Sequence, residues 1–67
     1  MTTTITLNGK IHISTCQNLL ELIQQMDLDD KRFAVEVNEN IIPKSRLATT
    51  LIHANDRIEI IQAVGGG

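Results

Sequence analysis

The N-terminal segment alternates apolar and polar residues with the two-residue period of a β-strand. The apolar positions are Ile5, Leu7, Ile11 and Ile13. They lie on either side of Asn8-Gly9, a dipeptide typical of tight hairpin turns. A plain two-residue turn would place the apolar residues before and after it on opposite faces of the hairpin. We therefore predict a bulged turn with Gly9 at positive φ, which brings all of them onto the core face and leaves His12 pointing outward.

The pattern changes to the period of a helix over residues 18–27. Its apolar stripe consists of Leu19, Leu22, Ile23 and Met26. Asn18 is a favourable N-cap, and Glu21, three residues later, can complete a capping box. The helix is expected to end near Asp27, because negative charge at a helix C-terminus opposes the helix dipole.

The second half of the chain returns to strand-like alternation, interrupted by turns. It predicts a strand over 33–37, a short edge strand at 41–42 that Pro43 ends, a helical turn over 44–47 and a last strand over 57–64. On the last strand Ile58 and Ile60 face inward. Between the helical turn and this strand, either Leu51 or Ile52 is expected to anchor residues 48–54 to the core.

This order of elements fits one main helix packed across one face of a mixed sheet of four to five strands, an α+β fold. If the first and last strands pair in the middle of the sheet, the fold is a β-grasp (ubiquitin-like) fold. We therefore predict a ubiquitin-like domain over residues 1–64 and a flexible C-terminal tail of the diglycine type over residues 65–67.

Composition narrows the possible functions. The 67 residues carry a net charge of −2 and Phe33 is the only aromatic residue, so the chain offers neither a basic surface nor a stacking platform for nucleic acid. No apolar stretch is long enough to span a membrane, and the first residues do not resemble a secretory signal. Cys16 is the single cysteine and cannot form an internal disulfide. We expect no nucleic-acid or membrane partner, and a reducing location in the cytoplasm or in a plastid stroma.

Few residues could support catalysis. Cys16 is followed closely by a predicted helix N-terminus, where the pKa of a thiol can fall, and His12 or His53 could in principle serve as its base. No third residue that would orient such a pair is evident, and a small residue in a strand-to-helix bend is the simpler interpretation of Cys16. Metal-binding spacings such as C-x-x-C and H-x-x-x-H are absent. We therefore expect no catalytic residue, no metal site and no bound cofactor.

The sequence ends in Gly65-Gly66-Gly67, which contain three of its four glycines. These glycines are either an inert end or a narrow strand that carries the carboxylate of Gly67 into the pocket of another protein. That carboxylate is ionised at neutral pH and is a poor acyl donor until it is activated. Because the predicted body offers no active site, we favour the second interpretation, with Gly65 and Gly66 inserted into a partner.

The segments 34–45, 55–61 and 63–67 resemble the ThiS family, the small sulfur carriers of thiamine biosynthesis. They contain a V-x-V-N motif that continues into I-I-P-K, a D-x-I-E-I-I strand, and a V-G-G-G end. Leu47 departs from the family, which often has tryptophan or another large residue at this position; the departure bears only on local packing.

The resemblance implies a function for the tail. An E1-like adenylyltransferase that uses Mg-ATP would adenylate Gly67, and sulfur from a cysteine desulfurase persulfide would convert the adenylate to a thiocarboxylate. Thiazole synthase would then receive the sulfur, and the chain itself would catalyse nothing. Alternatives with a related tail are the small subunit of molybdopterin synthase and a ubiquitin-like protein modifier; the remaining one is an interaction module with an inert tail.

A partner that receives the tail must also grip the body of the protein, usually through an exposed apolar patch. Ile61 and Ala63 lie on the last strand, on the face opposite Ile58 and Ile60. They are therefore the candidate docking residues. The alternative is that the last strand is covered on both faces and that Ile61 belongs to the core.

Overall fold

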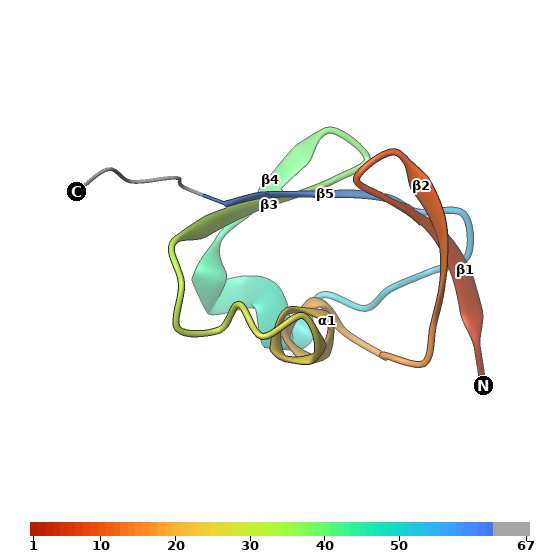
Figure 1. Ribbon diagram of the computed structural model, residues 1–67, viewed down its shortest axis with the longest axis horizontal. Coiled ribbons are helices and arrows are strands. Elements are labelled where there is room, and N and C mark those ends of the chain that lie inside the picture. Colours follow the sequence, from red (N-terminus) through yellow and green to blue (C-terminus); the bar gives the residue numbers. More distant parts are fainter. Residues whose placement is uncertain (63–67) are drawn as a thin grey trace.

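The computed structural model describes residues 1–62 and contains one mixed sheet with a helical layer on one face (Figure 1). Its elements are β1 (Thr3–Leu7), β2 (Lys10–Ser14), α1 (Leu19–Gln25), β3 (Phe33–Val37), β4 (Asn40–Ile42), the 3₁₀ helix η1 (Lys44–Thr49) and β5 (Arg57–Gln62). The five strands lie in the order β2-β1-β5-β3-β4. β1 and β5 are parallel, and the other neighbours are antiparallel. The predicted α+β fold, with the first and last strands side by side in the middle of the sheet, is confirmed.

The β1–β2 hairpin differs from the prediction of a bulged turn. Leu7 pairs directly with Lys10 across a plain two-residue turn, in which Asn8 and Gly9 have φ values of 51° and 81°. Both residues tolerate positive φ, so the tight turn forms without strain and sets the register. The expected bulge, which would have turned the isoleucines of β2 inward, is therefore wrong.

This register reverses the two faces of β2. Ile11 and Ile13 are 80% and 64% exposed on the outer face of the sheet. His12 pairs with the buried Ile5 and so lies on the core side, half-buried, where it was expected to point outward. Ser14 completes this inner face and is 1% exposed. Its hydroxyl oxygen is satisfied because it accepts a hydrogen bond from the Cys16 N–H at 3.0 Å.

Helix α1 begins where the sequence predicts. The side chain of Asn18 caps it by accepting from the Glu21 N–H at 2.9 Å, and Glu21 in turn accepts from the backbone N–H of Gln17 at 2.9 Å. The helix ends at Gln25, earlier than the predicted boundary. Asp27 adopts a left-handed conformation with φ of 64°, and Leu28 N–H donates to the carbonyl of Ile23, which together form a Schellman termination.

The second half of the fold follows the predicted order. β4 is short, lies at the edge of the sheet and stops before Pro43, after which η1 forms. Of the two candidate anchors for the following segment, Ile52 is buried and Leu51 is 57% exposed. Leu47 is buried on η1 and belongs to the core.

The core lies between the sheet and the helical layer. Its buried apolar members are Ile5, Cys16, Leu19, Leu22, Ile23, Val35, Leu47, Ile52, Ile58 and Ile60. Ile58 and Ile60 face inward as predicted, which places the central strand β5 directly over α1 and η1. Within residues 1–62, no helix has the length and apolarity needed to cross a membrane.

The termination of α1 provides a test of its conformation. Replacing Asp27 by glycine should raise the free energy of unfolding by roughly 1 kcal/mol, because a residue with a Cβ is strained at φ of 64°. Urea denaturation monitored by circular dichroism measures the change. Asp29→Gly is the matched control, since it removes a neighbouring negative charge at a position whose φ is not positive. Equal stabilisation by both substitutions would attribute the effect to charge and contradict the conformational explanation.

Candidate functional site

Some of the predicted site residues lie in the part of the chain that the structure describes, and others lie outside it. Gly65, Gly66, Gly67 and Ala63 lie outside the described residues. The structure does describe β5, the strand that leads to them, as far as Gln62. The geometry relevant to function is therefore how β5 is held and what surface surrounds it.

β5 is held on both sides by neighbouring strands. β3 pairs with it from Ile58, opposite Val37, to Gln62, opposite Phe33. β1 pairs with only its first part, where Leu7 lies beside Ile58. The core side of the strand is fixed by burial of Ile58, which is 1% exposed. The strand that precedes the tail is thus a rigid central element.

Two asparagines in tight turns add hydrogen bonds to β5 from either side. Asn8 and Asn38 have the same φ of 51°, and each is the first residue of a two-residue hairpin turn. The side-chain oxygen of Asn38 accepts from the N–H of Arg57 at 2.9 Å, at the start of β5. The side-chain oxygen of Asn8 accepts from the N–H of Ile60 at 2.8 Å, nearer to the tail. Both asparagines therefore complete the backbone hydrogen bonding of this strand.

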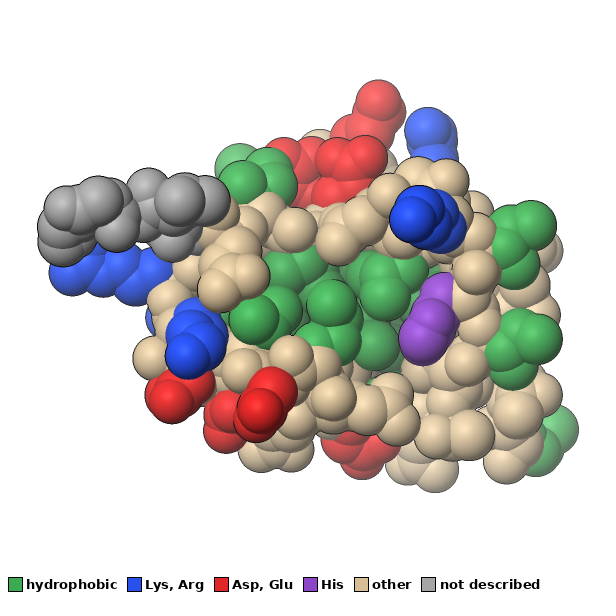
Figure 2. Space-filling view, viewed as in Figure 1, with side chains coloured by type: hydrophobic (Ala, Val, Ile, Leu, Met, Phe, Trp, Pro, Cys, Tyr) green, Lys and Arg blue, Asp and Glu red, His purple; other side chains and the backbone are tan. Residues whose placement is uncertain are grey.

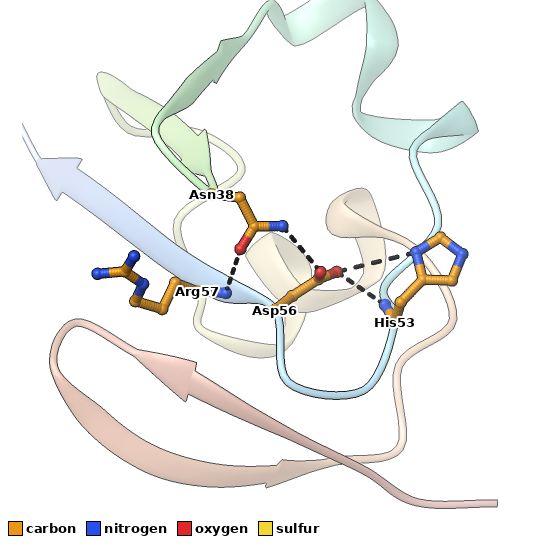
Figure 3. A network of polar contacts seen from close by, with 4 residues as sticks. All are labelled: Asn38, His53, Asp56 and Arg57. Atoms are coloured by element: carbon orange, nitrogen blue, oxygen red, sulfur yellow. Dashed lines mark hydrogen bonds and ion pairs between the residues drawn. The ribbon is translucent and has the colours of Figure 1, made fainter.

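Figure 3 shows the polar network at the start of β5. Asp56 is 9% exposed and accepts from the Asn38 side-chain amide at 3.0 Å and from the His53 backbone N–H at 2.8 Å. The His53 ring lies farther away, with Nδ1 3.9 Å from the carboxylate, and its side chain is 74% exposed. Asn38 and Asp56 belong to the sequence motifs quoted above, and the structure gives them a structural role: they fasten the β3–β4 turn to the start of β5.

The outer face of the sheet carries exposed apolar residues beside β5. Ile61 is 54% exposed, lies on the face opposite Ile58 and Ile60, and pairs with Ala34 of β3. Ile41 of β4 is 72% exposed on the same face. The structure thus excludes burial of Ile61 in the core. It also adds Ile41, which the sequence analysis treated only as part of an edge strand.

Acidic residues lie next to these isoleucines. Glu36 and Glu59 are directly opposite one another on β3 and β5, an arrangement in which like charges repel. With Glu39 and Arg57 they line a shallow hollow of about 150 Å³. Figure 2 shows acidic side chains gathered above the sheet, with hydrophobic side chains beside them. The face around β5 is therefore apolar and acidic. The strand alternation of each glutamate was visible in the sequence, but their juxtaposition depends on the register of β3 against β5.

The catalytic alternative finds no support in the geometry. Cys16 and His53 both line a hollow of about 390 Å³ at the end of the molecule near Met1. Cys16 is nevertheless buried, and its Sγ donates a hydrogen bond to the side chain of Gln25 at 3.3 Å. His12 lies on β2 rather than on this hollow. Among residues 1–62, no group of three or more histidine, cysteine or acidic side chains is arranged to hold a metal ion.

Known proteins resemble this chain over most of its length. A family model described as "ThiS family" matches residues 1–67. The chain is 29% identical over 51 residues to the sulfur carrier protein ThiS of Escherichia coli (strain K12), covering 76% of this chain and 77% of that protein. It is 31% identical over 64 residues to a thiazole synthase of Paramagnetospirillum magneticum, covering 94% of this chain and 20% of that longer protein.

A solved structure supports the same relationship. The crystal structure of the thiamine biosynthesis protein (ThiS) from Geobacter metallireducens superposes with a TM-score of 0.75 at 25% sequence identity. The superposition covers 97% of this chain and 100% of the other. The shared architecture is the β-grasp arrangement described above.

The polar network at the start of β5 predicts unequal effects of substituting its members. Asp56→Ala should lower the free energy of unfolding by about 2 kcal/mol, because it leaves the His53 N–H and the Asn38 amide without their acceptor. His53→Ala should change it by less than about 0.5 kcal/mol, since the ring is exposed and distant from the carboxylate. Chemical denaturation of both variants measures the difference. Comparable losses would show that the imidazole, rather than the backbone N–H, is the stabilising partner of Asp56.

Proposed function

The chain belongs to the ThiS family of sulfur carrier proteins, and we propose that it carries sulfur as a thiocarboxylate on Gly67 for thiazole formation in thiamine biosynthesis. Members of this family are carriers and not enzymes. The observation that best supports the proposal is the combination of a rigid central strand, β5, with the glycines that follow it in the sequence. Because β5 is hydrogen-bonded on both sides, the segment that carries Gly67 starts from a fixed position. Glycines have no side chains, so this segment can enter a narrow site.

The proposed chemistry begins with activation of the carboxylate. A carboxylate oxygen of Gly67 attacks the α-phosphorus of Mg-ATP bound to an E1-like adenylyltransferase, which forms an acyl-adenylate and releases pyrophosphate. A persulfide derived from a cysteine desulfurase then attacks the acyl carbon, and AMP leaves. A thiol reduces the resulting acyl disulfide, so that the carrier retains one sulfur as the thiocarboxylate. The carrier supplies only the carboxylate in these steps.

Two partner enzymes follow from this proposal. The adenylyltransferase activates Gly67, and thiazole synthase accepts the sulfur. The similarity of this chain to one part of a longer thiazole synthase supports the second partner, because there the two functions would reside in a single polypeptide. We propose the cytoplasm, or the stroma of a plastid, as the location of these reactions.

We propose that both partners grip the outer face of the sheet around Ile61. This residue is exposed near the end of β5 and has Ala34 and the exposed Ile41 on the neighbouring strands. The Glu36–Glu59 pair, with Arg57 lining the same hollow, would favour a basic group on the partner, since such a group would reduce the repulsion between the two carboxylates. Ala63, the other docking residue predicted from the sequence, would extend this surface toward the tail.

The carrier function can be tested by intact-mass analysis. When the chain is incubated with Mg-ATP, the adenylyltransferase of the same organism, a cysteine desulfurase, cysteine and a thiol, its mass should increase by the difference between one sulfur and one oxygen. Gly67→Val should show no such increase and no loss of thermal stability, because the described core is built from residues 5–60. A wild-type chain of unchanged mass would refute the carrier function.

The same experiment separates the related alternatives. Covalent adducts of the chain with other proteins would identify a protein modifier. Rescue of a strain that lacks the small subunit of molybdopterin synthase, without rescue of a strain that lacks the thiazole sulfur carrier, would assign the chain to the molybdopterin pathway.

The docking surface predicts a difference between two exposed isoleucines. Ile61→Asp should raise the KM for the adenylyltransferase by about tenfold, corresponding to the loss of one apolar contact at the centre of an interface. Ile11→Asp is the matched control, because Ile11 is exposed on the same face of the sheet but on the edge strand β2. Pyrophosphate exchange measures both values at a temperature where circular dichroism shows each variant folded. Equal effects of the two substitutions would contradict a docking site centred on Ile61.

A further inference from the structure

The parallel pairing of β1 with β5 stops before β5 ends. Backbone bonds link Thr6 N–H to the carbonyl of Asp56 at 2.9 Å and Asn8 N–H to the carbonyl of Ile58 at 2.9 Å. Beyond this point β1 turns back at Asn8-Gly9, and β5 continues without a strand on that side. The next N–H of β5 that points toward β1 is that of Ile60, which would lack a strand partner.

The side chain of Asn8 fills this place. In a regular parallel ladder, Ile60 N–H would donate to the main-chain carbonyl of the residue at position 8. Here it donates instead to the side-chain oxygen of Asn8, at 2.8 Å. Asn8 adopts the left-handed conformation that forms the tight turn. In the same position, its side-chain oxygen takes the place of the carbonyl that a continuing strand would supply. The bond extends the pairing of β5 by one step toward the tail.

We infer that Asn8 is a positioning residue that holds the β1 side of β5 as far as Ile60 and so helps to present Gly67 to a partner. The inference rests on the proposed function, in which Gly67 must reach a partner's active site after the body has docked. With Asn8 in place, β5 is held from both sides up to Ile60. Without it, only β3 holds the strand beyond Ile58, and the effective concentration of Gly67 at the partner's site falls because the end of β5 is held less firmly.

Asn38 provides the comparison that distinguishes positioning from stability. It has the same φ of 51° and also accepts from an N–H of β5, but that N–H belongs to Arg57 at the opposite end of the strand from the tail. It makes a further bond to Asp56, so its loss removes more hydrogen bonds than the loss of Asn8. Substitution of Asn38 should therefore cost more stability and leave delivery of the tail unchanged.

The experiment compares Asn8→Gly, Asn38→Gly and Asn8→Asp in the full chain. Glycine tolerates φ of 51° and keeps both turns. Asn8→Gly therefore loses only the side-chain acceptor, whereas Asn38→Gly loses its acceptor and also the amide that donates to Asp56. Aspartate keeps an acceptor oxygen and should restore wild-type behaviour. Amide exchange followed by NMR reports the bond to Ile60, and pyrophosphate exchange with the adenylyltransferase of the same organism reports kcat and KM.

For Asn8→Gly we expect amide exchange at Ile60 to accelerate by about fivefold, as for loss of one hydrogen bond. We also expect kcat to fall by about twofold to fivefold with an unchanged KM, since docking precedes insertion of the tail. Asn38→Gly should lower the unfolding temperature further but leave both kinetic constants at the wild-type values.

Each other outcome has a defined consequence. An unchanged kcat for Asn8→Gly, or an equal decrease in Asn38→Gly, would overturn the positioning role and leave the carrier function intact. A wild-type chain that is not adenylated at all would overturn the proposed function, and the inference about Asn8 with it. Failure of Asn8→Asp to restore kcat would show that the amide itself, rather than an acceptor oxygen, is required.

Discussion

The hydrogen bonding of β5 is the constraint on which the rest of the structure depends. This last strand lies between β1, from the beginning of the chain, and β3, from its middle. Its inward residues Ile58 and Ile60 complete the core beneath it. The chain can close its core only when its two ends have met, because the parallel β1–β5 pair joins residues far apart in sequence. The strand that precedes the C-terminal glycines in the sequence is therefore also the centre of the fold.

An asparagine in a tight turn hydrogen-bonds to this strand on each of its two sides. Asn8 and Asn38 each open a tight hairpin turn in the left-handed conformation, and each presents a side-chain oxygen to a backbone N–H of β5. Asparagine suits this purpose because its short side chain tolerates positive φ and carries an acceptor at the distance of a neighbouring strand. At the β3–β4 turn, Asn38 also donates a hydrogen bond to the buried Asp56. Asp56 accepts a second bond from the His53 N–H and so links the turn to the loop before β5.

In the proposed function, the folded body of the protein supports the C-terminal glycines and takes no part in the reaction. Its one thiol is buried and hydrogen-bonded, and its polar network is occupied by backbone and amide groups within the fold. What the body presents to a partner is a sheet face on which exposed isoleucines surround a pair of opposed glutamates. In the proposed function, such a face would select a partner and orient it relative to the end of β5, and the reaction would proceed in the partner's active site on a group that the carrier supplies. The proposed function requires three features of the carrier: the rigid strand β5, a sheet face that a partner recognises, and C-terminal residues without side chains.

The sequence by itself determined the order of the elements, the N-cap at Asn18, the inward face of β5 and the family to which the chain belongs. These features depend on local periodicity, capping chemistry and short motifs, which operate over a few residues. The tertiary structure decided the faces of β2, because the tight Asn8-Gly9 turn set the register and exposed Ile11 and Ile13 where burial had been expected. It also decided that Ile52 and not Leu51 anchors its segment, that Glu36 lies opposite Glu59, and that Asn8 reaches Ile60. Each of these depends on which strands become neighbours and in what register, and that is settled by the packing of the whole sheet rather than by any one stretch of the sequence.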